Sequence, residues 1–197
     1  MMNKKDTQKD ILERMRTDMT DLDIQRYLPE TNSPQDNLMK YSELADVNSI
    51  YDILPYDRSY KIILVESEYS KGHFVAILRY GNTIEQFDSY SKKIDDELSF
   101  VSNLQKQLLG QDKKYLTHLL KKLPKKVKKI YNKKRLQKLV NNSATCGRFV
   151  ILRIILMKDF GFNLQQYQDF LERWCKKTGL NANELVAFYY INIIWGR

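Results

Sequence analysis

The chain is poor in the residues that most often build metal and disulfide sites. Its 197 residues include only two cysteines and two histidines. Structural zinc sites need four Cys or His ligands in close pairs, so Cys146 and Cys175 do not form such a site by themselves. We expect no metal and no cofactor. A disulfide between the two cysteines is disfavoured, because no secretory signal is visible and the compartment is therefore expected to be reducing.

Long apolar runs are also missing. Two of the apolar runs, Phe149–Leu152 and Ile154–Met157, are separated by Arg153. A membrane-spanning helix needs roughly 20 apolar residues, so neither run is long enough. Residues 1–19 carry charges throughout and lack the apolar region of a secretory signal. We therefore expect a protein that is not secreted and does not insert into a membrane.

The apolar content that is present suffices for one core. Hydrophobic residues make up 43% of the chain, which at this length predicts a single domain covering residues 1–197. Within it we distinguish an N-terminal helical portion (1–55), a catalytic core (60–160) and C-terminal helices (161–197). We expect a monomer.

The net charge of +9 comes from one segment of the chain. Between Gln111 and Lys138 there are twelve Lys or Arg residues and one acidic residue, Asp112, so this segment carries +11 and the remainder −2. Two interpretations stay equally open: a solvated lysine-rich edge, or a weak contact with the phosphates of DNA. The lysines that would make the contact are Lys121, Lys122, Lys125, Lys126, Lys128, Lys129, Lys133 and Lys134.

The hydrophobic periodicity changes along the chain in an α+β order. Strand-like stretches cover 61–66, 73–80 and 83–90, with a hairpin signal at Gly81-Asn82, and a basic edge strand is expected at 128–137. We predict a small central mixed sheet flanked by helices, with a buried helix over 146–158. The other expected helices are 7–19, 20–28, 42–53, 95–109, 115–123, one from Asn163 to near Gly179, and one from Asn181 or Asn183 to Tyr190.

Cys146 lies at the expected beginning of the buried helix. Free backbone N–H groups and the positive end of the helix dipole favour an anion there, so the thiolate is the easier state. Gly147 lets another backbone or a substrate come close. Taken alone, this position fits a nucleophile and also fits an ordinary buried cysteine, which is the commoner case.

The only bases available to such a nucleophile are two histidines. His118 lies in a lysine-rich helical segment and is most simply a surface residue, whereas His73 begins a strand directly after Gly72. Strand ends aim side chains into clefts. Asp88, across the Gly81-Asn82 hairpin, is positioned to orient the imidazole, although an isolated aspartate at a strand end is more often a cap.

Four short motifs in this order resemble a known family. They are GHF (72–74), FDSY (87–90), LQ (136–137) and NSATCG (142–147), and they resemble the adenain-like cysteine proteases, which include the adenovirus maturation protease and the SUMO-specific proteases. The chain is most similar to the proteases of virophages and Maverick/Polinton elements, where a YN, LQ, TCGR pattern recurs. The resemblance covers roughly residues 60–160.

The resemblance implies a catalytic role for four residues. Cys146 would be the nucleophile, His73 the general base and then acid, and Asp88 the group that orients the imidazole. Gln137 would supply the side-chain donor of the oxyanion hole, and the backbone N–H of Cys146 would be the second donor. The cleft residues implied by the motifs are Gly72, Phe74 and Gly147.

The sequence departs from the family pattern at two places. Phe74 stands where the family usually has tryptophan, and Gln137 lies farther ahead of Cys146 than is usual. Because the connecting loop is longer, Asn141 becomes a second candidate for the oxyanion hole. We prefer Gln137, since the strand expected at 128–137 would hold it rigidly.

The resemblance implies a viral maturation protease acting by acyl transfer to water. The substrate would be the precursor of a viral capsid protein or another virion protein, and the protein would work in the virion and in the cytoplasm of the infected host. Two alternatives stay open: a deconjugase or acyltransferase acting on ubiquitin-like modifiers, and a catalytically inactive, lysine-rich module that binds nucleic acid.

Overall fold

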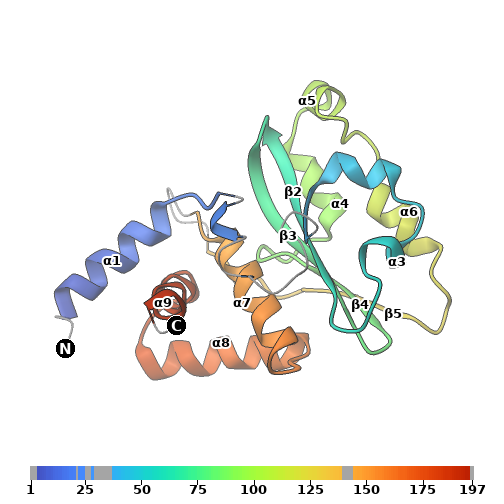
Figure 1. Ribbon diagram of the computed structural model, residues 1–197. Coiled ribbons are helices and arrows are strands. Elements are labelled where there is room, and N and C mark those ends of the chain that lie inside the picture. The colour runs from blue at the N-terminus through green and yellow to red at the C-terminus, as the bar shows by residue number, and fades with distance from the viewer. Residues whose placement is uncertain (1–3, 21, 25–27, 29–36, 139–143, 196–197) are drawn as a thin grey trace.

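A mixed β-sheet lies between two layers of helices in the computed structural model (Figure 1). The structure describes residues 4–20, 22–24, 28, 37–138 and 144–195. The sheet follows the order β1-β2-β3-β4-β5. The α+β fold class, with a small mixed sheet flanked by helices, is therefore confirmed.

The centre of the sheet is an antiparallel meander of three strands. β2 pairs with β3 and β3 with β4 in antiparallel register, whereas β1 runs parallel to β2 and β5 runs parallel to β4. The strand bounds are β1 Leu38–Lys40, β2 Tyr60–Glu68, β3 Lys71–Tyr80, β4 Thr83–Phe87 and β5 Lys128–Tyr131. The basic edge strand is therefore present, but it ends at Tyr131 and does not reach Gln137. β1 had no signal in the sequence, because three residues are too short to show a period.

Two glycines allow the close turns around β3. Gly81, between β3 and β4, has a φ of 52°, which a side chain would disfavour. Gly72 faces Glu66 of β2, and a Cβ atom at this position would lie 2.0 Å from the carbonyl oxygen of Val65. Only glycine fits there, so the beginning of β3, where His73 stands, is held tightly against β2.

The helix that carries the cysteine lies buried on one face of the sheet. α7 spans Cys146–Lys158, and ten of its 13 residues are buried. It packs on alternate strand residues such as Ile62, Leu64 and Ala76 in one hydrophobic cluster. Its buried cation is neutralised, because Arg153 donates from Nε and Nη2 to the two carboxylate oxygens of Glu85 at 2.9 and 2.7 Å. The predicted buried helix at 146–158 is confirmed.

The opposite face of the sheet is covered by short helices. The intervening strand residues, such as Ile63, Val75 and Ile77, form a second cluster with them. These helices are η2 Tyr41–Asp46, α3 Ile50–Ile53, α4 Ile94–Glu97, η3 Leu98–Phe100 and α6 Tyr115–Lys121, whereas α5 Asn103–Leu108 has no buried residue and takes no part in the cluster. α6 confirms the helix expected at 115–123, apart from its last residues.

The single helices expected at 42–53 and 95–109 are wrong. Each region is broken where an extended residue is followed by a serine that caps the next helix. Val101 is extended and the hydroxyl of Ser102 accepts a hydrogen bond from the backbone N–H of Gln105. Val47 is extended and the hydroxyl of Ser49 accepts one from the backbone N–H of Tyr51. The apolar period alone did not reveal these interruptions, because apolar residues such as Leu104 and Leu108 continue the helical spacing beyond the break although they are exposed.

The chain ends and begins with helices that pack beside each other. α8 spans Leu164–Thr178, begins with an Asn163 capping box and ends at Gly179 with a φ of 74°, as its sequence predicts. α9 (Ala182–Trp195) runs beyond the expected end at Tyr190, and α1 covers Lys4–Arg16 in place of 7–19. Of the helix expected at 20–28, residues 22–24 are helical and most of the others lie outside the described residues.

α1 lies against α9 through a small cluster of Ile11, Met15 and Ala187. Among the described residues, every helix is too short or too polar to cross a bilayer. The division into an N-terminal portion, a core and C-terminal helices stays a prediction.

Candidate active site

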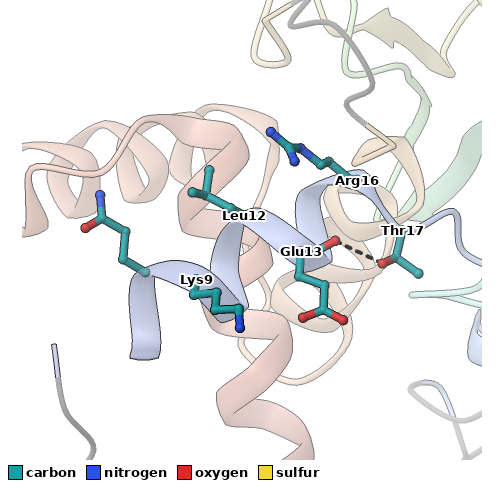
Figure 2. A pocket seen from close by; sticks show the side chains of 6 residues that line it. Lys9, Leu12, Glu13, Arg16 and Thr17 are labelled. Atoms are coloured by element: carbon teal, nitrogen blue, oxygen red, sulfur yellow. Dashed lines mark hydrogen bonds between the residues drawn. The ribbon is translucent and has the colours of Figure 1, made fainter. Parts of the chain in front are cut away.

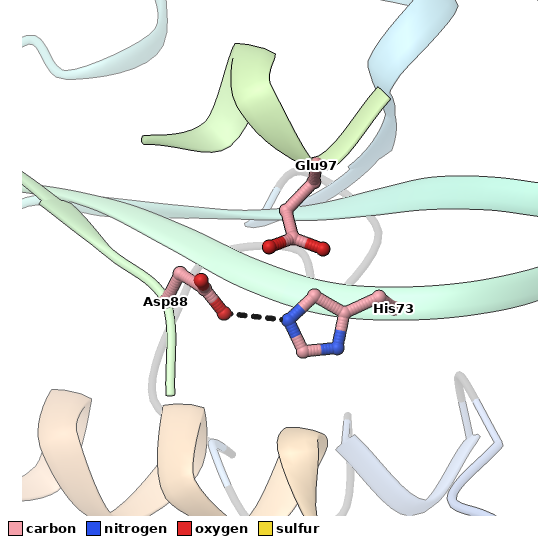
Figure 3. Close-up of side chains that lie close together, drawn as sticks. All are labelled: His73, Asp88 and Glu97. Carbon is pink, nitrogen blue, oxygen red and sulfur yellow. Dashed lines mark hydrogen bonds and ion pairs between the residues drawn. The ribbon is translucent and has the colours of Figure 1, made fainter. Parts of the chain in front are cut away.

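The imidazole of His73 and the carboxylate of Asp88 are in direct contact (Figure 3). His73 lies near the beginning of β3, and Asp88 directly follows the last residue of β4, which pairs with β3. The hairpin therefore brings the two side chains to the same end of the sheet. His73 Nε2 lies 2.7 Å from Asp88 Oδ1. The sequence placed these two residues together, and the structure does the same.

Asp88 is fixed and fully buried. Oδ1 also accepts a hydrogen bond from the backbone N–H of Tyr90 at 3.0 Å, and Oδ2 accepts one from the backbone N–H of Lys92 at 2.8 Å. Burial alone would raise the pKa of Asp88, but the hydrogen bond and positive charge of His73, together with these two N–H donors, lower it. The carboxylate thus stays ionised beside the imidazole and orients the ring.

The thiol of Cys146 is the third member of this group. Cys146 is the first residue of α7, and its side chain interacts with His73 by a hydrogen bond and by charge. Burial would raise the pKa of the thiol, but the positive charge and hydrogen bond of His73, and the backbone N–H groups of Phe74 and Gly147, lower it. The sulfur is therefore closer to the thiolate state than an ordinary cysteine.

The pKa of His73 moves in the complementary direction. Burial favours the neutral ring, but the negative charge of Cys146 and the hydrogen bonds to Asp88 and Cys146 outweigh burial and raise the pKa to about 10. Asp88 occupies Nε2, so Nδ1 is the ring nitrogen left to exchange a proton with the thiol. A thiolate next to an imidazolium is the arrangement that a cysteine nucleophile requires.

Gln137 lies close to this group but is held differently from the expectation. It is 1% exposed. Residues 132–136, which are not part of a strand, separate it from β5, so the reason given for preferring it, a continuous strand, is wrong. Ser89 holds it instead. The carbonyl oxygen of Ser89 accepts from the backbone N–H groups of Leu136 and Gln137, and its hydroxyl donates to Gln137 Oε1 at 2.7 Å. The amide nitrogen is then directed away from Ser89. Asn141 lies outside the described residues.

Asn132 of the YN motif supports the same region, a role that the sequence did not predict. It is fully buried, and its amide Nδ2 donates to the carbonyl oxygen of Asp88 at 2.7 Å. Gln168 of α8 donates to Asn132 Oδ1 at 2.8 Å. A buried amide with both ends bonded ties the end of β5 to the turn after β4. Its place in a recurring motif was the available signal.

Glu97 is a second buried carboxyl that the sequence analysis missed. It belongs to α4, is 5% exposed, and points toward Asp88 and His73 (Figure 3). Burial first, and then the negative charge of Asp88, raise the pKa of Glu97 to about 7 against the opposing charges of His73 and Lys92. In the sequence it was one of several acidic residues in the helix expected at 95–109.

His73, Glu97, Gln137 and Cys146 line a cleft of about 1360 Å³, whereas Asp88 is fully buried and reaches the cleft only through its bond to His73. Its wall near the sulfur is tight: a Cβ on Gly147 would lie 3.0 Å from Met19 Sδ and 3.4 Å from the Phe74 ring. Tyr90 lies over His73 with ring centroids 5.0 Å apart. The three predicted cleft residues, Gly72, Phe74 and Gly147, all line it. The predicted catalytic residues that line it are His73, Gln137 and Cys146.

The other residues with reactive side chains lie elsewhere. His118 is exposed on α6 and does not line the cleft, and Cys175 is partly buried on α8, where burial raises the pKa of its thiol. A smaller hollow of about 620 Å³ runs along α1, where Leu12 and Arg16 are among its walls (Figure 2). It brings together no cysteine or histidine.

The basic segment is exposed to solvent. All eight lysines named as a DNA contact are exposed, from the end of α6 to the turn after β5. Most of their charge is not neutralised within the described residues; one exception is Lys134, which forms an ion pair with Glu172 of α8. The segment leads along the chain to Gln137, at the cleft.

The fold and the site define an α+β protein with a cysteine and a histidine in one cleft and a buried aspartate bonded to the histidine. No protein-family model matches the chain. The chain is 30% identical over 156 residues to "Uncharacterized protein V9" of Sputnik virophage, and the alignment covers 79% of this chain and 82% of that protein. The chain therefore belongs to the same family as this virophage protein.

A comparison with solved structures matches the SUMO protease Ulp1, in a structure with its catalytic cysteine oxidised to a sulfenic acid. The match has a TM-score of 0.41 and 14% sequence identity, and it covers 98% of this chain and 96% of that chain.

Proposed function

We propose that the chain is a cysteine endopeptidase of the adenain-like class. The observation that carries the proposal is the contact chain from Asp88 through His73 to Cys146, in which the 2.7 Å bond fixes the ring and the thiol pKa is lowered. The order of the GHF, FDSY, LQ and TCGR motifs supports the same conclusion.

In the proposed mechanism His73 and Cys146 form an ion pair before substrate binds. The thiolate attacks a peptide carbonyl in the cleft, and a new C–S bond forms while the carbonyl electrons move to oxygen. The His73 imidazolium then donates its Nδ1 proton to the leaving amine, and the C–N bond breaks. The neutral ring next takes a proton from water, whose oxygen attacks the thioester; the C–S bond breaks, and the acid leaves while the thiolate and the imidazolium are restored.

The tetrahedral oxyanion would be held by two donors. One is the backbone N–H of Cys146 in the first turn of α7, where N–H groups have no partner inside the helix. The other is the amide of Gln137, because the Ser89 hydroxyl keeps the oxygen of that amide turned away. Asn141 remains the alternative donor, as the sequence suggested.

The substrate we propose is a capsid or other virion precursor, and the place of action is the virion and the infected-host cytoplasm. The family relationship to a virophage protein supports a viral setting. The narrow wall made by Met19, Phe74 and Gly147 favours small residues next to the scissile bond. We propose a monomer, since one chain supplies all the groups that the mechanism needs.

The test is cleavage of a purified capsid precursor, run in parallel with a ubiquitin-like conjugate. We expect Cys146→Ala and His73→Ala to abolish cleavage, whereas the matched variants Cys175→Ala and His118→Ala retain it. Cleavage of the conjugate alone would support the deconjugase alternative instead. The proposal would be contradicted if Cys146→Ala kept full cleavage activity. It would also be contradicted if a control variant, Cys175→Ala or His118→Ala, lost as much activity as its active-site counterpart.

The exposed lysines favour a second role, in holding the enzyme on packaged DNA. Duplex binding should weaken steeply with salt, because each neutralised phosphate releases a counterion. Replacing Lys125, Lys126, Lys128 and Lys129 with glutamine should reduce this salt dependence and leave peptide cleavage unchanged. If DNA binding does not depend on salt, or is unaffected by the replacement, the proposed DNA-holding role is wrong. The alternative that the chain is an inactive nucleic-acid-binding module is then wrong as well.

A further inference from the structure

Glu97 completes a cluster of three potential metal ligands. One ligand atom each from His73, Asp88 and Glu97 lies within 4.8 Å of the other two. The three residues come from β3, the turn after β4 and α4, so the fold and not local sequence assembles them. In Figure 3 the Glu97 side chain comes from α4, above the bonded His73–Asp88 pair in this view, and its carboxylate points toward the pair.

One oxygen of Glu97 lacks a hydrogen-bond partner. Oε1 is buried and bonds to none of the described residues, and the nearest ion-pair partner, Lys92, is 3.9 Å away at Nζ. Buried polar atoms in folded proteins nearly always have a partner, and a missing partner often marks the place of an ion or a water molecule. The orphaned oxygen is therefore a second, independent indication of a ligand beside His73 and Asp88.

The donor set matches a zinc-type cation. Imidazole nitrogen and carboxylate oxygen are both zinc ligands, and an open zinc site takes three protein ligands with the fourth position left to water. Bonds of about 2.0–2.2 Å place tetrahedral ligand atoms roughly 3.4 Å apart. His73 Nε2 and Asp88 Oδ1, now 2.7 Å apart, would separate slightly while Glu97 moves closer. His73 and Glu97 both line the cleft, so an ion can reach them.

We propose that His73, Asp88 and Glu97 form a binding site for a divalent cation of the zinc type. The sequence analysis expected no metal because it considered only the cysteines and histidines. The ion replaces the His73–Asp88 hydrogen bond and neutralises two buried carboxylates. Soft and borderline cations, such as Zn²⁺, fit an imidazole ligand better than Mg²⁺ or Ca²⁺ do.

Cation binding at this site inhibits the proposed enzyme reversibly. Once Nε2 coordinates the ion, the proton of the neutral ring is confined to Nδ1, the nitrogen that faces Cys146. Giving that proton to the leaving amine would leave an anionic imidazolate, and while Nδ1 keeps the proton the ring has no lone pair with which to take one from water. This consequence rests on the proposed function, whereas binding of the ion does not.

Calorimetric titration of the chelator-treated full chain with zinc chloride tests the site. Cys146→Ala is the background, because the variant removes the thiolate as a competing ligand and keeps the three proposed ligands. We expect one ion per chain. Adding Glu97→Gln should weaken binding by roughly tenfold or more, while the matched change Asp96→Asn, an exposed residue of the same helix, should leave it unchanged.

Failure to bind zinc, or equal affinity with and without Glu97→Gln, would overturn the proposal. Equal weakening by Glu97→Gln and Asp96→Asn would overturn it as well. Circular dichroism shows whether each variant is folded. If Glu97→Gln does not fold, His73→Ala takes its place, with His118→Ala as its match and the same outcomes. Since the background variant has no nucleophile, the result is independent of whether the wild-type chain cleaves peptides.

Discussion

Replacing Ser89 with alanine tests whether this residue orients Gln137 for catalysis. The hydroxyl of Ser89 is buried and donates to Gln137 Oε1 at 2.7 Å. Without the donor the amide can rotate and direct its oxygen, instead of its N–H groups, toward the substrate. The backbone bonds from Leu136 and Gln137 to the Ser89 carbonyl remain, so the chain around the site should stay folded.

The size of the effect follows from the bond that is lost. A neutral hydrogen bond contributes about 0.5–1.5 kcal/mol net. With about 1.36 kcal/mol per tenfold change in rate, Ser89→Ala should lower kcat roughly 2- to 13-fold. Gln137→Ala removes the oxyanion donor itself and should lower kcat on the order of 100-fold or more. Neither change should raise KM much, because the oxyanion exists only in the transition state.

The assay is steady-state hydrolysis of a peptide that spans a capsid-precursor cleavage site, with Ser99→Ala as the control. Ser99 is exposed and its hydroxyl bonds only to the Asp96 carbonyl, so this variant should match the wild type. A Gln137→Ala variant with wild-type kcat would refute the assignment of Gln137 and favour Asn141. A Ser89→Ala variant as inactive as Gln137→Ala would show that Ser89 does more than orient the amide.

Two further predictions concern the ion pairs. Asp88→Asn keeps the size of the side chain but removes the charge that orients His73, so kcat in the peptide assay should fall by roughly 10³- to 10⁴-fold; a fall of less than tenfold would contradict the triad. Glu85→Gln leaves the buried charge of Arg153 unpaired and should lower the free energy of unfolding, measured in urea, by about 3–5 kcal/mol. The control Asp96→Asn, at an exposed ion pair, should lower it by at most about 1 kcal/mol. Similar losses in both variants would contradict the structural role of the buried pair.

The sequence predicted the parts of the fold that have a long, uniform period. The buried helix after Cys146 and the hairpin at Gly81-Asn82 were found because their patterns extend over many residues. The broken helices around Val47 and Val101 were not, since the apolar spacing continues across each short extended break, even where residues beyond it, such as Leu104 and Leu108, are exposed. Three-residue β1 carries too few positions to show any alternation.

The site was predictable only where a motif marked it. His73, Asp88 and Cys146 stand in short patterns; His73 and Cys146 line one cleft, and Asp88 is bonded to His73. Glu97 stands in no motif, and it lines the cleft as the last residue of the short helix α4. The support of Gln137 by Ser89 was also hidden, since the chain between Tyr131 and Gln137 bends back to the turn after β4 instead of continuing the strand.

The most direct test of the central claim is the alkylation rate of each cysteine as a function of pH. Iodoacetamide reacts with the thiolate, and peptide mapping by mass spectrometry separates the labelling of Cys146 from that of Cys175. The pKa of the Cys146 thiol is lowered, and that of His73 is raised to about 10. The ion pair therefore forms below the usual thiol pKa and persists until His73 loses its proton.

We predict that Cys146 of the chelator-treated protein is alkylated rapidly at pH 6–7, where Cys175, with its raised thiol pKa, reacts slowly. His73→Ala should move the Cys146 profile upward in pH, and His118→Ala should leave it unchanged. Equal rates for the two cysteines in the wild type, or a Cys146 profile that is the same with and without His73, would contradict the account.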